Sequence, residues 1–205
     1  MADRGVGAEN GSGEARWLTL ANLITSIRFP LAPLCAFSLL YEWPLAAFAI
    51  YWLAVASDLL DGRVARRRGE VSSLGGLLDH SSDALFVAAG LGALAAQGVI
   101  PWPLPILVGA AFAQYAADSR ALAGRRLRTS ELGRLNGIAY FVLLGVPVVR
   151  DALGLGWPSA LLVSALGWLL VATTLLSMAD RAITWTLSRK APDSPGAGRS
   201  GRSPH

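Results

Sequence analysis

Long apolar stretches separated by short polar connections run through most of the chain. Six of these stretches approach the roughly 20 residues that a helix needs to cross a lipid bilayer. They predict an all-α, polytopic membrane protein with six transmembrane helices, at about Leu18–Tyr41, Pro44–Ala65, Leu74–Gln97, Trp102–Ser119, Leu135–Val149 and Trp157–Ala179. The first stretch is interrupted by polar residues and prolines, namely Asn22, Thr25, Arg28, Pro30 and Pro33.

Composition supports the same fold class. Of the 205 residues, 53% are hydrophobic and only 16% are charged, which is too apolar for an ordinary soluble domain. We expect one membrane domain over residues 17–189, between polar, disordered cytosolic tails at 1–16 and 190–205. The chain has a single cysteine, Cys35, so no intrachain disulfide can form.

Arginines alternate between the connections and so predict an orientation. They gather after the second, fourth and sixth stretches, at Arg63, Arg66, Arg67, Arg68, Arg120, Arg125, Arg126, Arg128, Arg134, Arg181 and Arg189. The opposite side carries only Arg150. By the positive-inside rule, both termini and the Arg-rich loops are cytoplasmic. Each loop arginine has two possible roles: it fixes this topology and attracts anionic lipids, or it contacts a substrate.

Four aspartates interrupt the apolar pattern where the second stretch ends and the third begins. Asp58 and Asp61 are three residues apart, and Asp79 and Asp83 are four apart, so each pair shares one helix face. An Asp inside a membrane costs about 2.5–3.5 kcal/mol at the centre of a span and less near the interface. A pair of divalent cations would neutralise this cluster, and carboxylate oxygens favour Mg²⁺ or Mn²⁺, with Ca²⁺ as a further possibility.

Small residues and one arginine lie beside the aspartates. Gly62 and Gly75 leave room for a bulky polar ligand, whereas Gly76 is more typical of close helix packing. Arg66 follows Asp61 by little more than one turn and is placed to pair with a phosphate. A two-metal site beside arginines suits phosphoryl or phosphatidyl transfer, because metals bridge a pyrophosphate and neutralise developing charge.

The order Asp58-x-x-Asp61-Gly62-x-x-Ala65-Arg66, then eight residues, then Gly75-x-x-x-Asp79-x-x-x-Asp83 resembles the signature of the CDP-alcohol phosphatidyltransferase family. The resemblance implies an enzyme that transfers a phosphatidyl group from CDP-diacylglycerol to an alcohol and releases CMP. It implies a homodimer, a site that faces the cytoplasm from the inner (cytoplasmic) membrane, contact with membrane lipids and no nucleic-acid partner.

The resemblance also implies residue roles. Asp58, Asp61 and Asp79 would be metal ligands, and Asp83 would both ligate the second metal and act as the catalytic base. The cytidine nucleotide would be bound by Asp58, Gly62, Ala65, Arg66 and Gly75.

The acceptor alcohol is predicted less directly. The segments Asn22–Pro33 and Ser130–Arg134 are similar to the branch of the family that uses glycerol 3-phosphate, which makes that acceptor the best guess. Arg28, Arg120, Arg134 and His80 are the candidate acceptor or phosphate contacts, with snorkelling to the surface as the alternative for Arg28. His80 follows Asp79 where that branch usually has proline, which keeps inositol, serine and CDP-choline or CDP-ethanolamine reactions open.

Two readings from other classes compete with an enzyme. Acidic residues in a membrane often mark a cation transport path, although such sites usually lie near the midplane and not at one interface. An inactive relative acting as a scaffold is the third reading, and the retention of all four aspartates argues against it.

Overall fold

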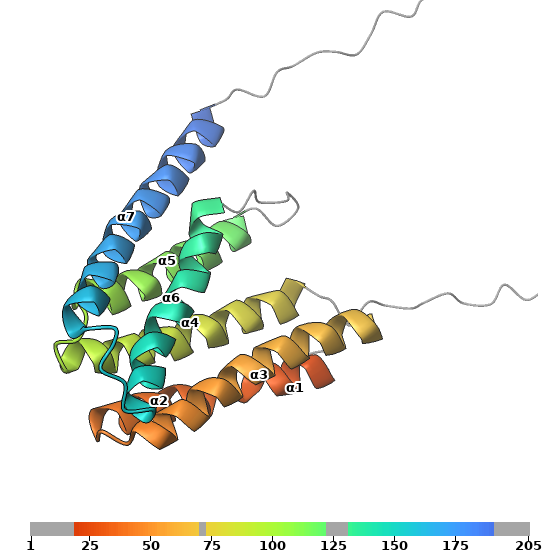
Figure 1. The fold of residues 1–205 in the computed structure, drawn as a ribbon. Helices are drawn as coiled ribbons and strands as arrows, with labels where there is room; N and C mark the ends of the chain where they lie inside the picture. Colours follow the sequence, from red (N-terminus) through yellow and green to blue (C-terminus); the bar gives the residue numbers. More distant parts are fainter. Residues whose placement is uncertain (1–18, 70–72, 122–130, 191–205) are drawn as a thin grey trace, which may run out of the picture.

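The computed structural model describes residues 19–69, 73–121 and 131–190, and every regular element within these ranges is a helix. Figure 1 shows the seven helical segments, and their order confirms the all-α prediction. They are α1 (Leu20–Ser26), α2 (Arg28–Leu40), α3 (Pro44–Arg68), α4 (Ser73–Ala96), α5 (Pro103–Ala121), α6 (Glu131–Ala152) and α7 (Ala160–Lys190).

The first predicted span is divided into α1 and α2 at Ile27. Pro30 lies one turn after the break and has no N–H to donate to the carbonyl of Ser26, so the helical ladder is interrupted there. The Thr19 side chain caps α1 by accepting from the backbone N–H of Asn22 at 3.1 Å. The break leaves Arg28 as the first residue of α2, and this position sets the direction of its side chain.

Four helical stretches are long and apolar enough to cross a membrane, judged by length and composition within the described residues: Leu20–Leu40, Pro44–Arg68, Glu131–Ala152 and Ala160–Thr184. Large apolar side chains cover their outer faces, and Leu161 of α7 is 81% exposed. A lipid environment accounts for such a surface, because exposed apolar area is unfavourable in water. The chain is therefore a multi-pass membrane protein.

Some helices extend at one or both ends beyond the apolar stretches that predicted them. The α6 helix begins at Glu131, four residues before the expected Leu135, and α7 continues to Lys190, well past Ala179. Hydropathy marks the part of a helix that contacts lipid, whereas backbone hydrogen bonding continues into the polar interface.

The first span separates the two helices that carry the aspartates. Both α1 and α2 pack against α3 and against α4, and α6 also contacts both of these helices. The α5 helix packs on α4, and α7 packs on α5 and α6 (Figure 1). Residues at the start of α2 are therefore placed between the acidic faces of α3 and α4.

A glycine allows α4 and α6 to pack closely. A Cβ atom added at Gly90 of α4 would lie 2.7 and 2.8 Å from the methyl groups of the buried Leu144 of α6. We expect Gly90→Ala to lower the free energy of unfolding, because overpacking costs about 1–3 kcal/mol against a gain of about 1 kcal/mol in helix propensity.

Gly92 of the same helix is the matched control, because an added Cβ there meets nothing within 4 Å. Gly92→Ala should be neutral or stabilising, and thermal unfolding in detergent micelles measures both variants. Equal shifts in melting temperature would contradict the close approach of α4 and α6.

Candidate active site

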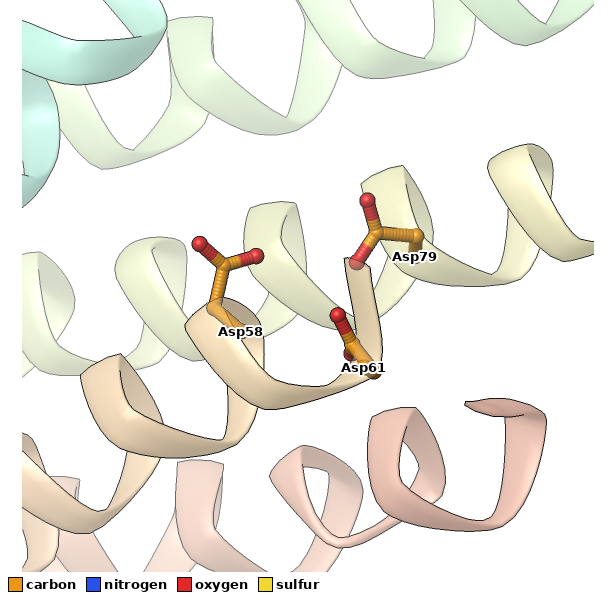
Figure 2. A group of neighbouring side chains, drawn as sticks. All are labelled: Asp58, Asp61 and Asp79. Atoms are coloured by element: carbon orange, nitrogen blue, oxygen red, sulfur yellow. The ribbon is translucent and has the colours of Figure 1, made fainter. Parts of the chain in front are cut away.

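Two helices supply the four carboxylates. Asp58 and Asp61 lie in the second half of α3, and Asp79 and Asp83 lie in the first half of α4. Figure 2 shows Asp58 and Asp61 on α3 and Asp79 on the neighbouring turn of α4. Ligand oxygens of these three residues all lie within 4.8 Å of one another. The i,i+3 and i,i+4 spacings thus bring the side chains together as predicted.

The Arg28 guanidinium binds all four carboxylates. Its Nη1 donates to Asp58 Oδ1 at 3.0 Å and also to Asp83, and its Nη2 donates to Asp79 Oδ1 at 2.6 Å and also to Asp61. The side chain is fully buried and does not snorkel to the surface. Charge-assisted bonds of this fork geometry are among the strongest that a protein makes. Arg28 therefore joins α3 to α4 through α2.

Asp61 is the most enclosed of the four acids. Its side chain is 6% exposed, whereas that of Asp58 is 44% exposed. The hydroxyl of Thr25, in α1, donates to Asp61 Oδ2 at 2.7 Å, which adds a fourth helix to the cluster. Burial of a carboxylate is tolerable only when it is paired in this way. Asp61 thus anchors the cluster, while Asp58, Asp79 and Asp83 remain more accessible.

The donor set fits divalent cations. The cluster offers only carboxylate oxygens, which hard cations such as Mg²⁺ and Mn²⁺ prefer. Four carboxylates against one guanidinium leave an excess of negative charge in a largely apolar setting, and further positive charge there is favourable. Asp58, Asp61 and Asp79 have the grouping needed to hold an ion, with Asp83 one turn further along α4.

A cavity of about 560 Å³ adjoins the cluster. Its wall includes Asp58 and Asp83, the predicted acceptor contacts His80 and Arg134, and otherwise mainly residues of α4, α5, α6 and α7. A ligand in this cavity would contact both the acidic cluster and the start of α6. The exposed side of the carboxylates is thus the side on which a second substrate fits.

A stack of side chains forms one part of the cavity wall. The ring of His80 stacks on Tyr115 of α5 with centroids 5.2 Å apart, and the Arg181 guanidinium lies 5.7 Å from the centre of the Tyr115 ring. His80 Nδ1 lies 2.8 Å from the carbonyl of Gly76 and 3.9 Å from Asp79 Oδ2. The structure therefore places His80 toward the cavity and beyond hydrogen-bonding distance of the Asp79 carboxylate.

Apart from Asp58, the residues predicted to bind the nucleotide lie near the end of α3 and the start of α4, outside the cavity wall. An added Cβ at Gly62 would lie 3.4 Å from Arg66 Nη1, so the exposed Arg66 side chain covers Gly62. Ala65, near the end of α3, and Gly75, near the start of α4, are both half-buried. Their roles stay predictions, as do those of Arg28 and Arg134 toward a phosphate. The side chain of Arg120 and residues 122–130 lie outside the described part of the chain.

Three polar residues of the cavity wall were not expected from the sequence as site residues. Arg181 was assigned only to topology, yet its guanidinium approaches Gly133, where an added Cβ would lie 3.0 Å from Arg181 Nη2. Gln114 and Asn136 also line the cavity. Gln114 and Asn136 are polar residues within apolar helices. Such residues usually face a protein interior, and this was the one signal in the sequence that could have found them.

The fold and the cluster define a multi-pass helical membrane protein with a carboxylate site suited to divalent cations. The family profile of the CDP-alcohol phosphatidyltransferases matches residues 18–186. The chain belongs to this family, which confirms the resemblance seen in its aspartate motif.

Individual relatives are distant and differ in their named activities. The chain is 29% identical to the cardiolipin synthase (CMP-forming) of Streptomyces coelicolor over 75% of this chain and 74% of the relative. It is 35% identical to the CDP-diacylglycerol–glycerol-3-phosphate 3-phosphatidyltransferase of Pseudomonas fluorescens over 45% of this chain and 50% of the relative. It spans about half the length of the "Probable phosphatidylglycerophosphate synthase" of Mycobacterium tuberculosis, at 29% identity.

A solved structure supports the fold. The apo phosphatidylinositol phosphate synthase of Mycobacterium tuberculosis superposes with a TM-score of 0.56 over 82% of this chain and 90% of that one, at 23% identity. At this identity the likeness concerns the arrangement of helices and not the acceptor.

Proposed function

We propose that the protein is an integral-membrane phosphatidyltransferase that moves the phosphatidyl group of CDP-diacylglycerol to an alcohol and releases CMP. The observation that carries the proposal is the cluster of four carboxylates that opens on a cavity, in a chain of this family. A transporter interpretation is less supported, because the family whose profile matches the chain is one of phosphatidyltransferases.

The chain's own residues divide the work. Asp58, Asp61 and Asp79 would hold divalent cations, with Asp83 as a further ligand of the second one. When bound, these ions supply neutralisation of the pyrophosphate charge. Asp83 reaches the cavity and accepts the proton of the acceptor hydroxyl. The acceptor oxygen then forms a bond to the phosphorus that bears the lipid, and the bond from that phosphorus to the CMP oxygen breaks.

The nucleotide and acceptor lie on different parts of the cluster in this proposal. Gly62, Ala65, Arg66 and Gly75, with Asp58, bind the cytidine nucleotide. The cavity takes the acceptor, and Arg134 and Arg181 supply positive charge for an acceptor phosphate. Glycerol 3-phosphate is the first candidate, with Arg120 and His80 as further contacts. The cardiolipin synthase among the relatives keeps phosphatidylglycerol as an alternative, and inositol, inositol phosphate and serine stay in the test panel below.

Membrane orientation and assembly complete the proposal. The six apolar stretches would be six spans, and the distribution of arginines would place both termini and the Arg-rich loops in the cytoplasm. This places the carboxylates at the cytoplasmic boundary of the inner membrane, where a soluble acceptor and a lipid donor meet. A homodimer is part of the proposal by family resemblance.

The proposal predicts metal-dependent release of CMP. Full-length protein in detergent should release CMP from CDP-diacylglycerol with Mg²⁺ or Mn²⁺ and the right acceptor, and EDTA should abolish the release. The acceptor panel is glycerol 3-phosphate, phosphatidylglycerol, inositol, inositol phosphate, serine, and diacylglycerol with CDP-choline as donor. Absence of CMP release with every member, together with cation flux into proteoliposomes that Asp61→Ala removes, would favour the transporter.

A further inference from the structure

Two amide side chains in the cavity wall, that of the half-buried Gln114 and that of the buried Asn136, each have a buried atom without a hydrogen-bond partner among the described residues. Gln114, on α5, donates from Nε2 to the carbonyl of Met178 at 3.2 Å, and its Oε1 accepts nothing. Asn136, on α6, is 4% exposed, and its Nδ2 donates to nothing. Leaving a buried polar atom unpaired costs about 1–3 kcal/mol, so a ligand that satisfies both atoms gains affinity from them.

The unpaired atoms differ in kind, which selects the chemistry of the ligand. Asn136 offers a donor, and Gln114 offers an acceptor. A hydroxyl group both donates and accepts, so a hydroxyl-bearing ligand can satisfy either atom. An ammonium group only donates and could bond only to Gln114, whereas a carboxylate only accepts and could bond only to Asn136. A polyol can satisfy either atom with any of its hydroxyls, and the arginines of the same wall, Arg134 and Arg181, oppose the ammonium group of an amino alcohol or an amino acid.

Positive charge on the same wall adds a second requirement. Arg134 lies half a turn before Asn136 on α6, and Arg181 of α7 lies over Tyr115, next to Gln114 in sequence. Asp83, the group that would take the proton of the reacting hydroxyl, lies on α4 and faces the cavity from another helix. A hydroxyl held by Gln114 or Asn136 can thus be a different one from the hydroxyl that reacts.

We propose that Gln114 and Asn136 read a second, unreactive hydroxyl of the acceptor, so that the acceptor is a phosphorylated polyol. This rests on the proposed function and narrows it, since inositol without phosphate, serine and choline-type acceptors are disfavoured. The phosphorylated polyol comes either as a free molecule or as the headgroup of a lipid, because both present the same phosphate and hydroxyl groups.

The test compares acceptors that differ by one hydroxyl. Glycerol 3-phosphate is paired with 3-hydroxypropyl phosphate in the soluble arm, and phosphatidylglycerol is paired with phosphatidyl-1,3-propanediol in the lipid arm. If inositol phosphate is the best acceptor, it is compared instead with an inositol phosphate that lacks one hydroxyl. For the better arm, we expect wild-type kcat/KM to fall roughly 10- to 100-fold when the second hydroxyl is missing, as one lost buried hydrogen bond predicts.

Substitution of the reading pair should remove that discrimination. Asn136→Leu and Gln114→Leu keep the side-chain size and should bring the ratio of the two kcat/KM values toward one, chiefly by lowering activity on the hydroxylated acceptor. Gln97→Leu is the matched control. Gln97 donates to the carbonyl of Leu39 at 2.7 Å, lines a different cavity, and should leave the ratio unchanged.

A second measurement separates this inference from the proposed function. Thermal stabilisation of the full-length protein by glycerol 3-phosphate and by 3-hydroxypropyl phosphate, without donor, reports binding even if no CMP is released. Should CMP be released while both Leu variants keep the wild-type ratio, or should serine be the best acceptor, the hydroxyl-reading role is wrong and the transferase remains. Complete absence of CMP release, with hydroxyl-dependent stabilisation that Asn136→Leu removes, overturns the transferase and keeps the reading pair.

Discussion

Replacing Asp61 with asparagine should abolish donor binding and turnover together, whereas Asp83→Asn should abolish turnover and largely keep donor binding. Asp61 is almost fully buried, bonded to Arg28 and Thr25, and central to the cation-binding group. Loss of its charge removes several kcal/mol of metal-dependent stabilisation, or about 10³-fold or more in rate. Asp83 faces the cavity, and loss of a general base costs about 10²- to 10⁴-fold.

Two measurements on purified protein check this contrast. Binding of CDP-diacylglycerol in Mn²⁺ or Mg²⁺, followed by calorimetry in detergent, should be lost in Asp61→Asn and retained in Asp83→Asn, while CMP release falls in both. Asp151→Asn is the control, because Asp151 lies near the end of α6 and pairs with Arg150. An Asp83→Asn enzyme with full activity would show that another group takes the proton.

Replacing Arg28 with leucine should destabilise the metal-free protein more than any other single change among the described ion pairs. The substitution leaves four carboxylates facing one another without the guanidinium that binds them all. Breaking a buried ion pair from one side costs about 3–5 kcal/mol. Divalent cations should recover a large part of this loss, because they supply positive charge to the same carboxylates.

Thermal unfolding in EDTA and in Mg²⁺ tests the prediction. The melting temperature of Arg28→Leu should drop sharply in EDTA and rise more steeply with Mg²⁺ than that of the wild type. Arg28→Lys is the matched variant, since lysine keeps the charge but cannot bond to four acceptors with a planar guanidinium. Its melting temperature in EDTA should lie between those of the wild type and Arg28→Leu. A leucine variant that melts like the wild type in EDTA would mean that the carboxylates do not depend on Arg28.

The sequence predicted the aspartate cluster well because its information is local. Spacings of three and four residues place each pair on one helix face whatever the rest of the fold does. The motif then led to the family that the comparison with known proteins confirms. The fold class was equally accessible, since apolar length is a direct requirement of the bilayer.

Residues that meet through tertiary packing were harder to predict. Arg28 was expected to contact a phosphate or to snorkel, and its four carboxylate partners lie 30 to 55 residues further along the chain. The break at Ile27, which directs it between α3 and α4, was suggested only by the nearby prolines. Arg181, Gln114 and Asn136 come from three helices whose contact depends on the whole bundle. No local pattern relates them to one another.

Arg28 also has a consequence for biogenesis. A chain made from its N-terminus delivers this guanidinium to the membrane 30 residues before Asp58 and 51 residues before Asp79. At roughly 5–20 residues per second, the first carboxylate follows about 2–6 s later. An unpaired arginine at the centre of a span costs about 2.5–3.5 kcal/mol on insertion scales. We therefore expect the first hairpin to settle in the bilayer as a unit, with α2 stabilised there once α3 supplies its carboxylates.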